Sequence, residues 1–179
     1  MPLDPFADRL ARDIRNSLST ALVEEVTGKE ETAVNTAAGQ WLQNDLPRDY
    51  RDYIESRRQR YHEAIGGIRA AGLTEPRRQA VMLWNDGLFF ELHELLETLW
   101  TATRGTERTA LKGVIQAAGA YVHHRRGKAE AGRKLAAKAI NSLQEGSAHL
   151  GFIGNPGALL QGLEHLEAEP PVLEIGGGA

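Results

Sequence analysis

Apolar residues recur every three or four positions along most of this chain, and this spacing constrains its fold more than any other feature. The first such series comprises Phe6, Leu10, Ile14, Leu18 and Leu22. No alternating apolar–polar pattern of useful length appears, except over Val172 to Ile175. Helices that each carry one apolar stripe must bury it against other helices. We therefore predict an all-α fold, a single-domain helical bundle of about seven or eight helices.

Proline and glycine mark the ends of the expected helices. Asp4-Pro5 has the order of a helix cap followed by a first-turn proline, and Pro170-Pro171 is expected to stop the last helix. Within one globular domain we distinguish an N-terminal helical region at 1–83, packed on the core, a helical core at 84–168 and an extended tail at 169–179.

Two glycines interrupt an otherwise helical stretch after Thr106. Gly113 and Gly119 each cost about 1 kcal/mol relative to alanine inside a helix. Such a cost is tolerated where another helix or a ligand approaches closely. We therefore predict a close contact on the face that carries these glycines.

The composition is that of a soluble globular protein, with 41% hydrophobic and 25% charged residues among 179. No stretch approaches the roughly 18 consecutive apolar residues of a membrane span. The N-terminus lacks the basic start and apolar run of a secretory signal. Cysteine is absent, which excludes disulfides and thiolate chemistry. We expect a cytoplasmic protein that does not bind membranes.

The net charge of −3 conceals an uneven distribution. Residues 79–103 carry a charge of −4, whereas residues 104–138 carry nine Lys and Arg against two Asp and Glu. The simpler interpretation is that these segments attract each other within the fold. The alternative is a surface between Arg104 and Lys138 that binds a small anionic ligand. No aromatic interleaving, zinc-finger or leucine-zipper pattern accompanies the basic residues, so we do not expect nucleic-acid binding.

The stretch from Trp84 to Trp100 holds the most informative residues. It begins with the turn signal Asn85-Asp86-Gly87 and continues as a helix. At 100° per residue, the predicted core face contains Phe89, Leu92, Leu96, Leu99 and Trp100. His93 falls within this face and Glu97 at its edge, and Glu94 falls on the flank. The residues predicted to point elsewhere are Glu91, Leu95 and Thr98.

His93 and Glu97 are spaced i, i+4, so their side chains can converge on one ion. A third ligand is expected from the next helix, where Gln116 and His123 lie seven residues apart on one side. We predict that His93, Glu97 and His123 bind a divalent metal ion, either zinc, iron or a similar cation. Gln116 would contact the bound group. Glu94 would be a further ligand, a hydrogen-bond acceptor for a histidine or a general base.

The order His93, Glu97, Trp100, preceded by Asn-x-Gly and two aromatics, resembles the signature of a small prokaryotic family. That family is known only as a domain of unknown function, and metal binding has been proposed for it. The resemblance covers about Trp84 to Leu143. It implies an all-helical fold and the location of a site.

A second block of the same family is similar to the stretch after Leu111. The matching residues are Gln116, His123 and Gly127. Lys112 stands where the family tends to have Gln, and Lys128 where it tends to have Asn. The resemblance therefore does not imply that residues at the two ends of this block contact a ligand.

Three roles remain open for these polar residues. In a structural role, which is the commonest for polar groups in bundle cores, they form a buried hydrogen-bonded cluster. In a metal-binding role they support metal-assisted hydrolysis, with Glu94 activating water. The third role is metal-free acid–base chemistry. The structural role corresponds to a non-catalytic binding or scaffold protein. Separately, we expect the chain to form a homo-oligomer.

Overall fold

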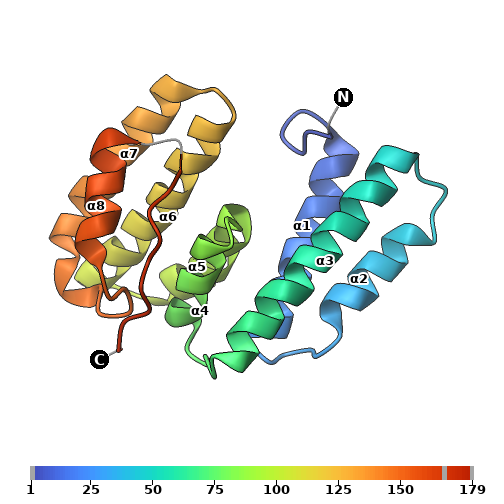
Figure 1. The fold of residues 1–179 in the computed structure, drawn as a ribbon, viewed down its shortest axis with the longest axis horizontal. Coiled ribbons are helices and arrows are strands. Elements are labelled where there is room, and N and C mark those ends of the chain that lie inside the picture. Colours follow the sequence, from blue (N-terminus) through green and yellow to red (C-terminus); the bar gives the residue numbers. More distant parts are fainter. Residues whose placement is uncertain (1–2, 167–168, 178–179) are drawn as a thin grey trace. The chain divides into compact units, whose positions relative to one another are not determined.

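The computed structural model describes residues 3–166 and 169–177, and within them it is all-α, as predicted (Figure 1). Eight α-helices and one 3-10 turn are present in these ranges, and the only strand-like feature is an isolated bridge between Ile153 and Ile175. The chain divides into two compact units, Met1–Thr74 and Glu75–Ala179. None of the described helices is both long and apolar enough to cross a bilayer.

The first unit consists of α1 (Arg9–Val26), α2 (Ala33–Leu42) and α3 (Arg48–Ala70), each of which packs against the other two. Its core is formed by fully buried side chains from all three helices, among them Ile14, Leu18, Leu22, Val34, Ile54 and Tyr61. The four-residue spacing seen in the sequence therefore locates the buried stripe of α1 correctly from Ile14 onward.

The start of the first helix differs from the Asp4-Pro5 prediction. α1 begins at Arg9, and Asp8 is its cap, because an Asp8 carboxylate oxygen accepts the Ala11 N–H at 2.6 Å. Asp4 instead stabilises a separate turn by accepting the Phe6 N–H at 2.9 Å. The Phe6 side chain is 45% exposed and lies 4.9 Å from the guanidinium of Arg15. The Phe6 ring therefore packs against a guanidinium and not in the hydrophobic core.

The second unit contains α4 (Pro76–Asn85), α5 (Phe89–Ala102), α6 (Gly105–Arg125), α7 (Ala129–Glu145), the 3-10 turn η1 (Ser147–His149) and α8 (Pro156–His165). The most extensive helix contact is that between α6 and α7. α5 packs on both α4 and α6, and α8 packs on α7. The tail, dark red in Figure 1, is extended and contacts α4 and the loop before α8.

Small residues allow α6 and α7 to approach closely, as the glycines predicted. A Cβ at Gly113 would lie 2.9 Å from the backbone nitrogen of Leu143, and a Cβ at Gly146 would lie 2.5 Å from that of Ala110. At Gly119 the added Cβ would meet the end of the Leu135 side chain at 2.8 Å. The contact predicted for this face is therefore made by a helix, α7.

The buried face of α5 is rotated from the predicted one. Its fully buried residues are Phe89, Glu91, Leu92, Leu95 and Leu96. Glu91 is 1% exposed and Leu95 is 0% exposed, although both were predicted to point away from the core. Leu99 and Trp100 are only half-buried. Trp100 lies beneath the guanidinium of Arg108, 4.0 Å from the ring centroid, so it is covered by a cation from α6.

We predict that Gly113→Ala lowers the free energy of unfolding by up to about 2 kcal/mol. The added methyl overlaps the Leu143 backbone, which costs about 1–3 kcal/mol, and alanine's helix preference returns only about 1 kcal/mol. Gly66→Ala in α3 is the control, because nothing lies within 4 Å of the position that its Cβ would take, and it is expected to be neutral or stabilising. Urea unfolding, followed by circular dichroism, measures the free energy of unfolding of both variants. If Gly113→Ala stabilised the protein as much as Gly66→Ala does, the close packing at Gly113 would be contradicted.

Candidate functional site

His93, Glu94 and Glu97 form a polar cluster on one side of α5. Their ligand atoms all lie within 4.8 Å of one another. The Nδ1 atom of His93 is 3.1 Å from a carboxylate oxygen of Glu94 and 3.9 Å from one of Glu97. The side chains of these residues are 39%, 30% and 49% exposed, respectively. The cluster is therefore at the surface, and His93 is not inside the core face where it was predicted.

The turn between α4 and α5 sets the direction in which this cluster points. Gly87 has a φ of +67°, its N–H is donated to the Trp84 carbonyl at 2.9 Å, and the Leu88 N–H is donated to the Leu83 carbonyl at 2.8 Å. These bonds close the end of α4 and place Leu88 and Phe89 against the core. The buried face of α5 is centred on Leu92, Leu95 and Leu96, and at about 100° per residue positions 93, 94 and 97 lie on the other side of the helix.

The surroundings of His93 favour its protonated form. The hydrogen bond to Glu94 is the main reason that the pKa of His93 is raised above 6.5, and the charge of Glu97 adds to it. Partial burial acts in the opposite direction and lowers this pKa. The imidazole also stacks on Phe90, with 6.3 Å between ring centroids. His93 is thus held by an aromatic ring on one side and two carboxylates on the other.

The two predicted partners on α6 do not join this cluster. Gln116 accepts a hydrogen bond from the Ser142 hydroxyl at 3.1 Å, so its side chain faces α7. His123 is absent from the group of ligand atoms around His93. The Nδ1 atom of His123 is buried and has no hydrogen-bond partner among the described residues. The structure therefore brings together His93, Glu94 and Glu97, all from one helix.

The basic residues of α6 contact α5 through its aromatic rings. Arg108 lies over Trp100, and the Arg125 guanidinium is 4.9 Å from the Phe89 ring centroid. Lys134 of α7 forms an ion pair with Glu130 of its own helix at 2.6 Å. Within the part of the chain that the structure describes, the carboxylates of the site pair with His93. Two cation–π contacts thus connect the acidic α5 with the basic α6.

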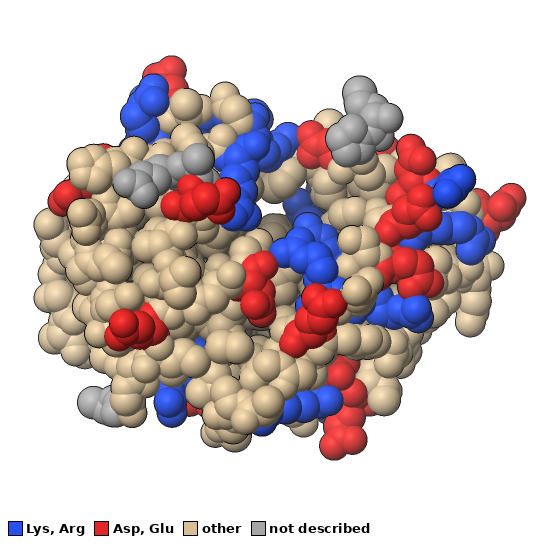
Figure 2. All heavy atoms as spheres, viewed as in Figure 1, with Lys and Arg blue, Asp and Glu red and all other residues tan. Residues whose placement is uncertain are grey.

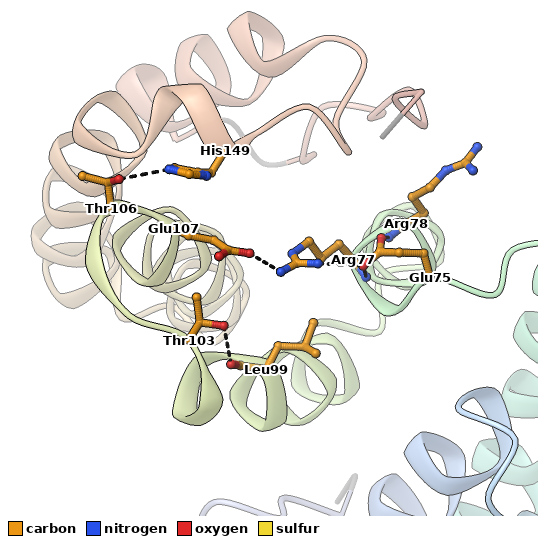
Figure 3. A network of polar contacts seen from close by, with 8 residues as sticks. All are labelled: Glu75, Arg77, Arg78, Leu99, Thr103, Thr106, Glu107 and His149. Atoms are coloured by element: carbon orange, nitrogen blue, oxygen red, sulfur yellow. Dashed lines mark hydrogen bonds and ion pairs between the residues drawn. The ribbon is translucent and has the colours of Figure 1, made fainter. Parts of the chain in front are cut away.

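A second polar network, which the sequence did not indicate, joins α4, α6 and η1 (Figure 3). Glu75 caps α4 by accepting the Arg77 and Arg78 N–H groups, both at 3.0 Å. Arg77 pairs with Glu75 and reaches across to Glu107 of α6.

The same region contains a hydrogen bond from η1 and a small cavity. His149 shares a hydrogen bond of 3.0 Å with the Thr106 hydroxyl (Figure 3). The cavity has a volume of about 200 Å³ and is lined in part by Arg77, Glu107 and His149. Glu75 and Glu107 both pair with Arg77, and His149 is hydrogen-bonded to Thr106, so we assign the network to holding these elements together.

The family match lies within the second unit. Residues 77–135 match the family described as Domain of unknown function (DUF309). The match covers about a third of the chain, from α4 into α7, and includes every predicted site residue. No curated protein and no solved structure matches the chain. The match supports the resemblance to a family of unknown function that was inferred from the residues.

We predict that Glu94→Gln lowers the pKa of His93 and that Glu97→Gln lowers it less, because the hydrogen bond to Glu94 is the largest cause of the upward shift. NMR titration of the imidazole resonances measures both. The raised folded-state pKa means that the interaction stabilises the fold below the ordinary histidine pKa of 6.5 and is lost as pH rises through the raised value. An unchanged titration in Glu94→Gln would contradict this account.

Proposed function

We propose that the DUF309-like unit binds a divalent metal ion through His93, Glu94 and Glu97. The observation that carries this proposal is the convergence of one imidazole nitrogen and two carboxylates within 4.8 Å on a single helix. A divalent transition metal with bonds of about 2.0–2.2 Å holds its ligand atoms roughly 3–4 Å apart. Small rotamer changes in the exposed Glu97 are sufficient to reach that spacing.

The donor set favours a borderline or moderately hard cation. One nitrogen and two carboxylate oxygens suit zinc, iron(II) or manganese, because thiolates are absent and oxygen predominates. Three protein ligands from one side leave further coordination positions to water or to a substrate. An ion of this kind acts as a Lewis acid and lowers the pKa of bound water, which is the chemistry of metal-assisted hydrolysis.

The partial exposure of the cluster distinguishes this proposal from a purely structural role. The structural role expected from the sequence places these groups in a buried hydrogen-bonded cluster, whereas all three side chains here are at least 30% exposed. Exposed ion pairs contribute only about 0–1 kcal/mol, so His93→Ala should leave the unfolding free energy nearly unchanged. The structural alternative requires a large loss of stability in the same variant.

We predict that full-length protein without a His tag binds Zn²⁺ or Mn²⁺ with a stoichiometry near one, measured by calorimetry and elemental analysis. His93→Ala should weaken binding by about 10–100-fold because it removes the nitrogen ligand. His62→Ala is the matched control: His62 is also an exposed helical histidine followed by a glutamate, but Gly66 stands where the site has its second glutamate.

The same titration decides between the two roles. Metal binding that is lost in His93→Ala and kept in His62→Ala, with unfolding unchanged in both, supports the metal centre. Failure of the wild-type protein to bind either ion, or equal binding by His93→Ala, would overturn it. The same titration at lower pH should show weaker metal binding, because the ion must displace the proton from His93.

A further inference from the structure

The C-terminal segment is held almost entirely by hydrogen bonds to its backbone. Asn85 pairs with Leu173 through both backbone groups, its amide donating to the Leu173 carbonyl and accepting the Leu173 N–H, each at 2.8 Å. Asn155 donates to the Val172 carbonyl at 3.1 Å and accepts the Glu174 N–H at 2.8 Å. Two asparagine amides thus bind an extended chain as a neighbouring β-strand would.

Three further bonds complete this recognition. The Trp84 indole N–H donates to the Pro171 carbonyl at 2.8 Å. The Gly154 N–H donates to the Glu174 carbonyl and the Gly176 N–H to the Phe152 carbonyl, both at 2.8 Å. Trp84 is 1% exposed. With Asn85, Asn155 and Gly162 it forms the surface that contacts the segment, which we call the groove.

Two side chains of the segment, Leu173 and Pro171, show the clearest fit to the surface beneath them. Leu173 is 3% exposed, whereas Val172 beside it is 76% exposed. Pro171 fits against Gly162 of α8, where an added Cβ would lie 2.8 Å from the proline Cδ. The surface over α8 and the tail in Figure 2 is mostly uncharged, and the ion pair between Arg125 and Glu169 is long, at 3.9 Å, with Glu169 90% exposed. The groove therefore selects an extended segment with proline and leucine two residues apart.

We propose that this groove is a peptide-binding site that takes the C-terminal segment of a second copy of the chain when its own segment is released. Pro-x-Leu occurs once in the sequence, at Pro171 and Leu173, so the partner with the required chemistry is the chain itself. One buried leucine and one proline ring provide little apolar burial. Segments with few buried apolar contacts open locally more readily than helical cores, which permits exchange.

The experiment mixes two full-length variants. Leu173→Asp disables the tail but keeps the groove, and the double variant Asn85→Ala, Asn155→Ala disables the groove but keeps the tail. Each alone should be monomeric by native mass spectrometry and sedimentation, whereas the mixture should form a 1:1 complex. Adding Leu173→Asp to the double variant should weaken that complex by about tenfold or more, because a charge would enter an apolar pocket. Val172→Ala in its place should have no effect.

A labelled peptide of residues 169–177 supplies an independent measurement. It should bind the folded Leu173→Asp chain, and bind wild-type protein at least about tenfold more weakly because the resident segment competes. Should Leu173→Asp not fold by circular dichroism, hydrogen exchange on wild-type protein decides: the Leu173 and Glu174 amides should exchange faster than those of α6. Exchange only by global unfolding, or no complex between folded variants, would overturn the proposal.

Discussion

The turn from Trp84 to Gly87 is the constraint on which the second unit depends. Gly87 adopts a positive φ of +67°, so the chain ends α4 and restarts as α5 within a few residues. The Trp84 ring meets Phe89 and Tyr121 edge-on, at centroid distances of 5.0 and 5.5 Å, and thereby attaches both α5 and α6 to the turn. Asn85 of the same turn pairs with the tail. One short segment thus determines the rotation of α5 and the position of the C-terminal segment.

The helical class follows from sequence because periodicity is a local property, but the rotation of α5 does not. Apolar residues occupy positions around most of its circumference, including Phe90, Leu95, Leu99 and Trp100. A sector centred on Leu92 and Leu96 can therefore extend to either side. The structure extends it toward Glu91 and Leu95, which are 1% and 0% exposed. Trp100 is satisfied outside the core by Arg108, a contact that no spacing rule specifies.

In the candidate site, too, some contacts could be predicted from the sequence and others could not. The approach of His93 to Glu97 depends only on one helical turn, and the sequence predicts it. The expected contribution of Gln116 and His123 required the rotation of α6 relative to α5, and the structure pairs Gln116 with Ser142 instead. Thr106 and His149 are 43 residues apart and are brought together by the fold, and no sequence motif predicts their hydrogen bond. Contacts within one turn are predictable, and contacts between helices depend on packing.

A cluster supplied by one helix has different physical consequences from one supplied by two. Its ligand geometry exists whenever α5 is helical, so it does not depend on the exact separation of α5 and α6. Binding of an ion would then stabilise the α5 helix itself more than its packing on neighbouring helices. The exposed flank would also leave the outer side of the proposed ion open to solvent, unlike the closed four-ligand sites that stabilise small metal-dependent folds. Since the buried apolar residues already provide a core for this unit, the ion that we propose would be free to bind or activate a molecule at the surface.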